Sequence, residues 1–260
     1  MNSAEFEAAQ RAREWFQGLT LLPGAWAVLR LDGRSFTRFT EQRFSKPYDE
    51  RFAGFMAETA RLLLTELGGR FAYTQSDEIS VLLPPEFALF GRRQEKLVSI
   101  SAGLASAAFT HAAGAPAHFD SRVWLGGSPA EVADYFSWRQ ADAARNALNA
   151  WSYWTLRGEG RSGGQATAEL RGLPEAAKHE LLFARGINFT ALPAWQRRGI
   201  GLWWQAVPVT GFDPVRETEV TSSRRRVHVE RELPVRREYR ELVLAQAGSG
   251  VATGRAPTAD

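Results

Sequence analysis

The chain has 260 residues, a formal net charge of +3, a hydrophobic content of 44% and no cysteine. This length suits one large domain or two small ones with a real core. The absence of cysteine excludes disulfide bonds, thiolate nucleophiles and cysteine-based zinc sites. Apolar runs are too short to cross a membrane, and the first residues lack the apolar region of a signal peptide. We therefore expect a soluble, cytoplasmic protein with no membrane partner.

Arginine carries nearly all of the basic charge, because only three of the 32 basic residues are lysines. A guanidinium binds phosphate in a fork and stacks on bases, which favours a nucleic-acid partner. A GC-rich genome explains the same composition equally well, so the clusters of arginine carry more information. These clusters are Arg92-Arg93, Arg197-Arg198, Arg224 to Arg226 and Arg236-Arg237.

The first half of the chain alternates helical and strand patterns. Apolar residues at helical spacing indicate helices, and apolar alternation that ends at turn residues indicates strands. In chain order we predict a helix over Ala4–Gln17, a strand over Gly24–Gly33, a helix over Asp49–Gly69, two strands joined by a turn over Phe71–Leu83, and a helix over Arg92–Gly114.

A long helix dominates the second half, after a strand over His118–Gly126. Ser128 lies three residues before Glu131 as in a capping box, and Pro129 suits the first helical position. The helical pattern continues through Arg157. We then predict short helices over 167–173 and 174–186, a strand over 197–207, and a strand or hairpin over 224–235.

This mixture of helices, strands and one antiparallel hairpin predicts an α+β fold, in which helices pack on one face of a sheet. We expect residues 1–140, with the N-terminal helix, to form the catalytic part. Residues 141–245 would form a helical and hairpin extension of the same compact unit. Residues 246–260 are small and polar, which predicts a disordered tail.

Carboxylates follow two of the predicted strands. Asp32 ends the strand "VLRLDG", and Asp77 and Glu78 end the strand "YTQSDE". If these strands are neighbours, Asp32 and Asp77 lie side by side, where like charges repel unless a cation joins them. Mg²⁺ prefers oxygen ligands, and two such ions lower the barrier for in-line attack at phosphorus. Because adjacent strand residues point to opposite faces, we expect Asp77 to be the inward ligand and Glu78 a weaker ligand or a supporting group.

Both acidic motifs also have a simpler interpretation, because Asp-Glu and Asp-Gly pairs are common in solvated turns. Spacing alone leaves both interpretations open. The surroundings favour phosphate binding, since Gly33 lets the backbone approach a ligand closely and backbone N–H groups there can cradle phosphate oxygens. Nearby positive charge comes from Arg34, Lys46, Arg92, Arg93 and Lys96, although a solvated helix face explains the last three equally well.

Several longer segments occur here in one order. They are "RLDGRSFTRFT", "FSKPYDERF", "YTQSDEISVLL", "RRQEKLVSISAGLASAAF", "FDSRVWL", "DYFSWRQADAARNALN", "KHELLFARGINF" and "RRGIGLWW". Together they resemble the tRNA-His guanylyltransferase family, and more closely its bacterial and archaeal guanylyltransferase-like branch. The resemblance covers Gly24 to Gln205 and continues weakly to about Tyr239. Several long motifs in fixed order are much more specific than any single one.

The resemblance implies a polymerase- or cyclase-like palm domain and a nucleotidyltransferase that works in the 3′-to-5′ direction. Family members add nucleotides to the 5′ end of tRNA, after activating the 5′-monophosphate with ATP or GTP. The 3′-hydroxyl of an incoming nucleotide then attacks the activated end. The family uses two Mg²⁺ ions and commonly forms homotetramers.

The resemblance also implies roles for the residues at matching positions. Asp32, Asp77 and Glu78 would be the catalytic carboxylates, and Asp32, the carbonyl of Gly33 and Asp77 would be the metal ligands. The expected nucleotide-binding residues are Asp32, Gly33, Arg34, Ser35, Phe36, Thr37, Lys46, Ser76, Asp77, Arg92, Arg93 and Lys96, of which Lys46 and the last three would hold the triphosphate. The expected RNA contacts are Arg139, Arg145, Asn146 and Lys178.

One departure from the family pattern bears on the substrate. The eukaryotic branch has a His-Ile-Asn-Asn motif where this chain has Ala144-Arg145-Asn146-Ala147, so the histidine is missing. We therefore expect template-dependent repair of 5′-truncated tRNA. The alternatives are addition of the extra 5′ guanylate to tRNA-His, a nucleotide cyclase or dinucleotide synthase on a related palm, and an inactive tRNA-binding module, against which the intact carboxylates argue.

Overall fold

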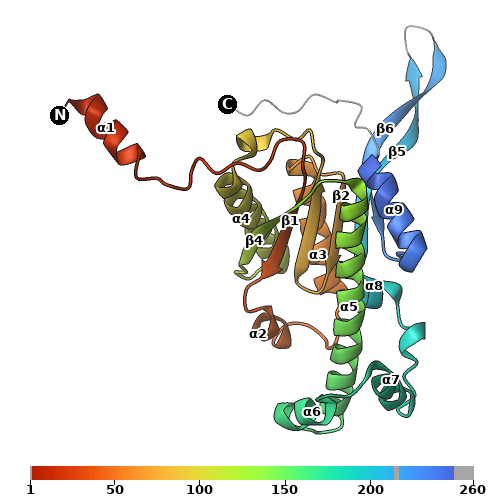
Figure 1. Cartoon of the computed structure of the whole chain (residues 1–260). Coiled ribbons are helices and arrows are strands. Elements are labelled where there is room, and N and C mark those ends of the chain that lie inside the picture. Colours follow the sequence, from red (N-terminus) through yellow and green to blue (C-terminus); the bar gives the residue numbers. More distant parts are fainter. Residues whose placement is uncertain (1, 214–216, 249–260) are drawn as a thin grey trace.

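A six-stranded sheet forms the centre of the protein, in the order β4-β1-β3-β2-β5-β6 (Figure 1). The computed structural model describes residues 2–213 and 217–248. All neighbouring strands within that part of the chain pair antiparallel. The strands are β1 (Trp26–Gly33), β2 (Phe71–Gln75), β3 (Glu78–Leu83), β4 (Phe119–Gly126), β5 (Ile200–Asp213) and β6 (Thr218–Glu230).

Helices cover both faces of this sheet, with α3 and α4 on one face and α5 and α9 on the other (Figure 1). The helices are α1 (Ser3–Arg11), α2 (Phe36–Glu41), α3 (Glu50–Glu66), α4 (Gln94–Ala113), α5 (Pro129–Gly158), α6 (Gly163–Leu170), α7 (Glu175–Phe183), α8 (Ala194–Arg198) and α9 (Arg236–Gly248), with 3₁₀ turns at Leu89–Arg92 and Phe189–Ala191. Among the described residues, none of the helices is long and apolar enough to cross a bilayer.

The central strand β1 explains why both faces are covered. Its residues alternate between two cores: Leu29 and Leu31 pack toward α3 and α4, and Trp26 and Val28 pack toward α5 and α9. A strand that is apolar on both faces must be buried on both. The α+β class with an antiparallel sheet is confirmed, but the prediction that helices pack on one face is wrong.

Helix α5 runs across the predicted boundary between the catalytic part and its extension. It begins after Ser128, whose side chain accepts from the backbone N–H of Glu131 as the capping motif predicts, and it ends at Gly158. The predicted boundary between residues 140 and 141 therefore falls inside one helix. Beyond α5, the strand β5 pairs with β2 and so extends the same sheet.

The two ends of the chain also differ from the predictions. Helix α1 ends at Arg11, before the predicted Gln17, has no buried residue and projects away from the sheet (Figure 1). Helix α9 was not predicted; it buries Tyr239, Val243 and Ala247. Residues 246–248 of the predicted disordered tail belong to α9, and residues 249–260 lie outside the described part of the chain.

An aromatic cluster fixes the end of β1. The ring of Phe36 lies 5.0 Å from that of Phe119, 5.2 Å from Phe109 and 5.3 Å from Phe39, measured between centroids. A methyl group added to Gly33 would meet this ring at 2.5 Å. Gly33 is therefore needed for the close approach of the Phe36 ring to the backbone that follows Asp32.

Replacing Phe36 with alanine should lower the free energy of unfolding by about 3–5 kcal/mol, because the ring is buried and its removal leaves a cavity. Chemical denaturation of the purified protein measures this change. Phe36→Leu is the matched control and should lose clearly less, since it keeps most of the volume. Equal stability of the alanine variant and the wild type would contradict the packing role.

Candidate active site

The carboxylates that end the two strands meet at one edge of the sheet. Strand β1 pairs with β3, which places Asp32 opposite Glu78. Ser76 and Asp77 form the turn between β2 and β3, with Ser76 in the left-handed region at φ 53°. The backbone N–H of Gly33 donates to the carbonyl of Asp77 at 3.0 Å, which ties the two strand ends together. The predicted convergence of these acids is therefore confirmed, and all three line one pocket.

Glu78 turns away from Asp77 and toward helix α5. Its two carboxylate oxygens accept from Nε and a terminal nitrogen of Arg139, at 2.7 and 2.6 Å. The same guanidinium donates to Asp142 at 3.1 Å, and the Arg139 side chain is only 11% exposed. This two-pronged ion pair leaves Glu78 as a supporting group. It also fixes the guanidinium in the wall of the carboxylate pocket, and the expectation that Arg139 contacts RNA stays a prediction.

The electrostatics of Asp77 depend on Asp32. Burial and the nearby charge of Asp32 raise the pKa of Asp77, while a hydrogen bond from Ser76 and the charge of Lys46 partly oppose the rise. Burial also raises the pKa of Glu78 against the opposing effect of Arg139. Two partly buried carboxylates in mutual repulsion gain free energy when a cation joins them.

The donor set fits Mg²⁺. Asp32, Asp77 and the Gly33 carbonyl offer oxygen atoms only, which are the ligands that this ion prefers, and it usually keeps several waters. Within residues 2–213 and 217–248, no group of three or more acidic or histidine side chains is placed to hold a metal. Two carboxylates with a backbone carbonyl and water would therefore be the complete set.

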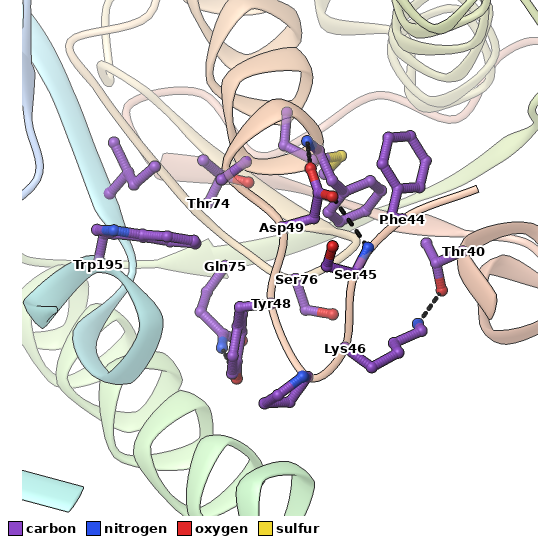
Figure 2. Close-up of a pocket in the computed structure, with 15 residues that line it drawn as sticks. Thr40, Phe44, Ser45, Lys46, Tyr48, Asp49, Thr74, Gln75, Ser76 and Trp195 are labelled. Atoms are coloured by element: carbon purple, nitrogen blue, oxygen red, sulfur yellow. Dashed lines mark hydrogen bonds between the residues drawn. The ribbon is translucent and has the colours of Figure 1, made fainter. Parts of the chain in front are cut away.

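Lys46 brings positive charge to the same place. Its ammonium donates to the hydroxyl of Thr40 (Figure 2). It also lies 5.6 Å from the ring centre of Trp154. Burial lowers the pKa of Lys46, and the charges of Glu41 and Asp77 oppose this. The expected grouping of Lys46 with Asp77 is thus present. A partly buried ammonium beside an acidic pocket is suited to bind an anionic group such as phosphate.

A second, largely apolar pocket adjoins the carboxylates (Figure 2). Its walls are Phe44, Phe52, Met56, Trp195 and Ile200, together with polar residues from the segment 45–49 and from strand β2. The two pockets share Pro47, Tyr48, Gln75 and Ser76. An apolar pocket next to an anion-binding one can take a molecule with a flat ring at one end and phosphates at the other.

Tyr48 and Gln75 stand between the two pockets, and the sequence analysis singled out neither. Gln75 donates from Nε2 to the hydroxyl of Tyr48 at 2.8 Å, and the Tyr48 ring meets Trp195 edge to face at 5.9 Å. Burial raises the pKa of Tyr48 far above its usual range, so the hydroxyl stays neutral. The "SKPYDERF" motif contained Tyr48, but only the fold brings it beside β2.

The residues that follow Asp32 divide into two groups. Arg34, Ser35 and Thr37 are exposed, as is Ser76 in the neighbouring turn, so these four predicted nucleotide contacts remain available. Phe36 is 3% exposed and belongs to the core, so its side chain does not face a ligand. For Phe36, the predicted nucleotide contact is therefore left to the backbone and stays a prediction.

The three basic residues around the start of α4 lie at the far end of the sheet. The segment before β1 holds them there, because the N–H of Leu21 donates to Arg92 and the N–H of Gln94 donates to Leu19. Strand β1 starts at Trp26, about 20 Å from Asp32 at a rise of about 3.3 Å per residue. Within one chain, the structure does not bring Arg92, Arg93 and Lys96 to the carboxylates.

Arg92 has a structural role at that end. Its guanidinium donates to five backbone carbonyls, those of Leu21, Leu22, Ala25, Pro85 and Phe87. This satisfies most of its donors and links the segment before β1 to the loop after β3. The expectation that Arg92 holds a triphosphate is wrong, because its donors are already bonded to the chain.

The remaining predicted RNA contacts lie on the surface of α5 and α7. Arg145 and Asn146 both donate to Asp142, at 2.8 and 3.3 Å, and Lys178 donates to Asn149 at 2.7 Å. Asn146 lines the pocket that holds the carboxylates. Only Asn146 of these three therefore borders the carboxylate pocket, and their RNA contacts stay predictions.

Taken together, paired carboxylates at the edge of an antiparallel sheet, a partly buried lysine and an adjoining apolar pocket fit the class of nucleotidyl-transfer enzymes. Comparisons with known proteins agree. Residues 9–126 match the family described as tRNAHis guanylyltransferase, and residues 130–243 match its "Thg1 C terminal domain". The chain belongs to the tRNA(His) guanylyltransferase family, whose members are nucleotidyltransferases.

Individual relatives cover most of the chain. A probable tRNA(His) guanylyltransferase of Dictyostelium discoideum is 35% identical over 223 residues, which cover 81% of this chain and 86% of that protein. The corresponding protein of Drosophila melanogaster is 39% identical over 193 residues, 69% and 67% of the two chains. A bacterial tRNA(His) guanylyltransferase-like protein solved with ATP is 26% identical, with a TM-score of 0.72 over 94% of this chain and all of that one, and with GTP the TM-score is 0.71.

Asp77→Asn should raise the thermal stability of the Mg²⁺-free protein at pH 7. Because the pKa of Asp77 is raised, the folded state binds more protons than the unfolded state between the ordinary aspartate pKa and the raised one. The free energy of unfolding therefore falls as pH rises through this range. The asparagine removes this cost, and the advantage should vanish at pH below the ordinary aspartate pKa. Melting curves at several pH values measure it.

Mg²⁺ should stabilise the wild type by about 2.7 kcal/mol at about 100 times its dissociation constant, and should stabilise Asp77→Asn far less. Glu58→Gln is the matched control, because Glu58 is an exposed carboxylate on α3 paired with Arg61. Equal stabilisation of all three proteins by Mg²⁺ would contradict the assignment.

Proposed function

We propose that this chain is a Mg²⁺-dependent 3′-to-5′ nucleotidyltransferase that adds nucleotides to the 5′ end of tRNA, acting in the cytoplasm as a homotetramer. The observation that carries the proposal is the pairing of Asp32 with Asp77 across β1 and the β2–β3 turn, with repulsion that raises the pKa of Asp77. Membership of the family supports the direction of addition and the tRNA substrate.

The metal would be held by Asp32, Asp77 and the Gly33 carbonyl. Bound Mg²⁺ neutralises charge on the reacting phosphate oxygens and aligns attacking and leaving groups. The chain's own groups do the remaining work. Glu78 and Arg139 keep the edge of the sheet at a fixed distance from α5, and Lys46 with Arg34 would bind phosphates of the nucleotide.

The adjoining apolar pocket would take the base of the activating nucleotide. Phe44, Phe52 and Trp195 offer apolar and aromatic surface, and Tyr48 with Gln75 offers polar groups at the mouth. The two bacterial guanylyltransferase-like structures are complexes with ATP and with GTP. A pocket that selects mainly by apolar contact suits an enzyme that accepts either purine for activation.

The proposed reaction has two transfers at phosphorus. An oxygen of the RNA 5′-phosphate attacks the α-phosphorus of ATP, and pyrophosphate leaves. The 3′-hydroxyl of the incoming nucleotide then attacks the phosphorus of the activated 5′ end, loses its proton to solvent and displaces AMP. GTP in place of ATP releases GMP in the second transfer.

We propose that the added nucleotides are directed by a template, as in repair of 5′-truncated tRNA. The support is the sequence Ala144-Arg145-Asn146-Ala147, which lacks the histidine of the eukaryotic motif. The second candidate is addition of a single guanylate to tRNA-His, which the names of the eukaryotic relatives favour. Both candidates use the same carboxylate site and differ in the RNA that is accepted.

Asp32→Asn and Asp77→Asn should each lower nucleotide addition by at least about 100-fold, because they remove charge stabilisation from the transition state. Arg34→Ala should lower it less, since several cations share the phosphates. Incorporation of labelled nucleotide into 5′-truncated tRNA in the presence of Mg²⁺ measures the rates, with Glu58→Gln as the exposed control. Near-normal incorporation by Asp77→Asn would remove the carboxylate pair from the mechanism.

A template test separates the two candidate functions. A tRNA that lacks its first nucleotide is offered each of the four NTPs, with the opposing 3′-strand nucleotide matched or mismatched. Template-directed repair predicts that the favoured NTP changes with the opposing nucleotide. Addition of guanylate alone, and only to tRNA-His, would favour the second candidate. A labelled product formed from NTPs without RNA would instead indicate a cyclase or dinucleotide synthase.

A further inference from the structure

Helices α5, α8 and α9 form a groove that the proposed chemistry does not use. Its basic lining consists of Arg145, Arg197, Arg198, Arg236, Arg237 and Arg240, against one carboxylate, Glu175. Helix α5 separates it from the carboxylate pocket. The groove is lined by Ser137, Ala141 and Ala144, whereas Arg139 and Asn146 line the pocket on nearly the opposite side of that helix.

Three of these arginines form no ion pair with a carboxylate anywhere in the described part of the chain. Arg197 and Arg198 donate only to the backbone carbonyls of Leu192 and Leu233, and Arg236 is exposed at the start of α9. Burial and the charge of Arg198 lower the pKa of Arg197, and the charge of Glu232 opposes this only in part. Adjacent guanidiniums repel one another, and an anion in the groove would reduce that repulsion.

One buried donor of the groove lining lacks a partner. Nε of Arg198 makes no hydrogen bond within the described residues. A buried donor that lacks an acceptor is costly, so an anion bound beside Arg198 would lower that cost.

We propose that this arginine groove binds the phosphate backbone of RNA, on the side of α5 that faces away from the carboxylate pocket. The inference rests on the proposed function, in which RNA is the substrate. Guanidinium forks from three helices match a chain of phosphates better than a single small anion. Arg145 links the two sites, because it lines the groove and donates to Asp142, which lines the carboxylate pocket.

The double variant Arg236→Gln/Arg237→Gln tests the groove with little risk to folding, because both side chains are exposed and neither donates to the backbone of another element. With the full-length protein and a 5′-truncated tRNA, fluorescence anisotropy should show about 10-fold or weaker binding. The slope of log affinity against log salt should fall by about two, one for each lost phosphate contact. The affinity for ATP, measured with Mg²⁺, should stay unchanged.

Arg11→Gln/Arg61→Gln is the matched control, since it also removes two exposed arginines, each paired with a glutamate on its own helix. Arg236→Lys/Arg237→Lys keeps the charge and should recover most of the salt slope. Equal RNA affinity and salt slope in the groove variant and the control would overturn the proposal. So would weakened binding of polyglutamate with unchanged RNA affinity, which would indicate an acidic polypeptide.

The outcomes separate this inference from the proposed function. If the wild type adds no nucleotide to tRNA but the groove variant still weakens RNA binding with a reduced salt slope, the groove stands and the enzymatic proposal fails. If nucleotide addition depends on Asp77 but RNA binding ignores the groove variant, the enzymatic proposal stands and the groove fails.

Discussion

The repulsion between Asp32 and Asp77 is the constraint on which the site depends. The two carboxylates come from different strands, and burial keeps water from screening them fully. Nothing local to either strand would bring them together, because each would be more stable alone in solvent. The register of β1 against β3 and the hydrogen bond from Gly33 to Asp77 impose the approach. The pairing of the strands therefore holds two carboxylates together although they repel each other. A divalent cation bound between them would make this arrangement favourable.

The surrounding contacts make that approach rigid. On one face, the Phe36 ring packs so closely against Gly33 that no side chain fits at this position. On the other face, Arg139 fastens Glu78 to helix α5 and also bonds Asp142. Charge balance is thus divided: Glu78 is neutralised by the protein itself, and Asp77 retains only the partial compensation of Lys46. That difference gives two adjacent carboxylates separate roles.

The sequence predicted the carboxylate site better than the phosphate contacts, for a physical reason. Alternation and turn signals located β1 and the hairpin, and an antiparallel pairing of the two was enough to bring Asp32 to Asp77. Lys46 followed from its place in a motif. The prediction that Arg92 lies near the carboxylates is wrong, because about 20 Å of strand β1 separates its end of the sheet from Asp32. Tyr48 was missed because its role depends on Gln75 and Trp195, residues that only the folded sheet places beside it.

The arginines of this chain have different roles, and the fold around each one determines its role. Arg92 lies where five backbone carbonyls converge, so its guanidinium hydrogen-bonds to the chain and links two loops. Arg139 forms ion pairs with Glu78 and Asp142, which fix the position of its side chain. Arg236 meets neither, and a guanidinium that is left with free donors beside other guanidiniums is available to an anion. The number of arginines in a sequence therefore indicates only how much phosphate a protein could bind. Where the phosphate binds depends on which guanidiniums lack hydrogen-bond acceptors from the protein itself.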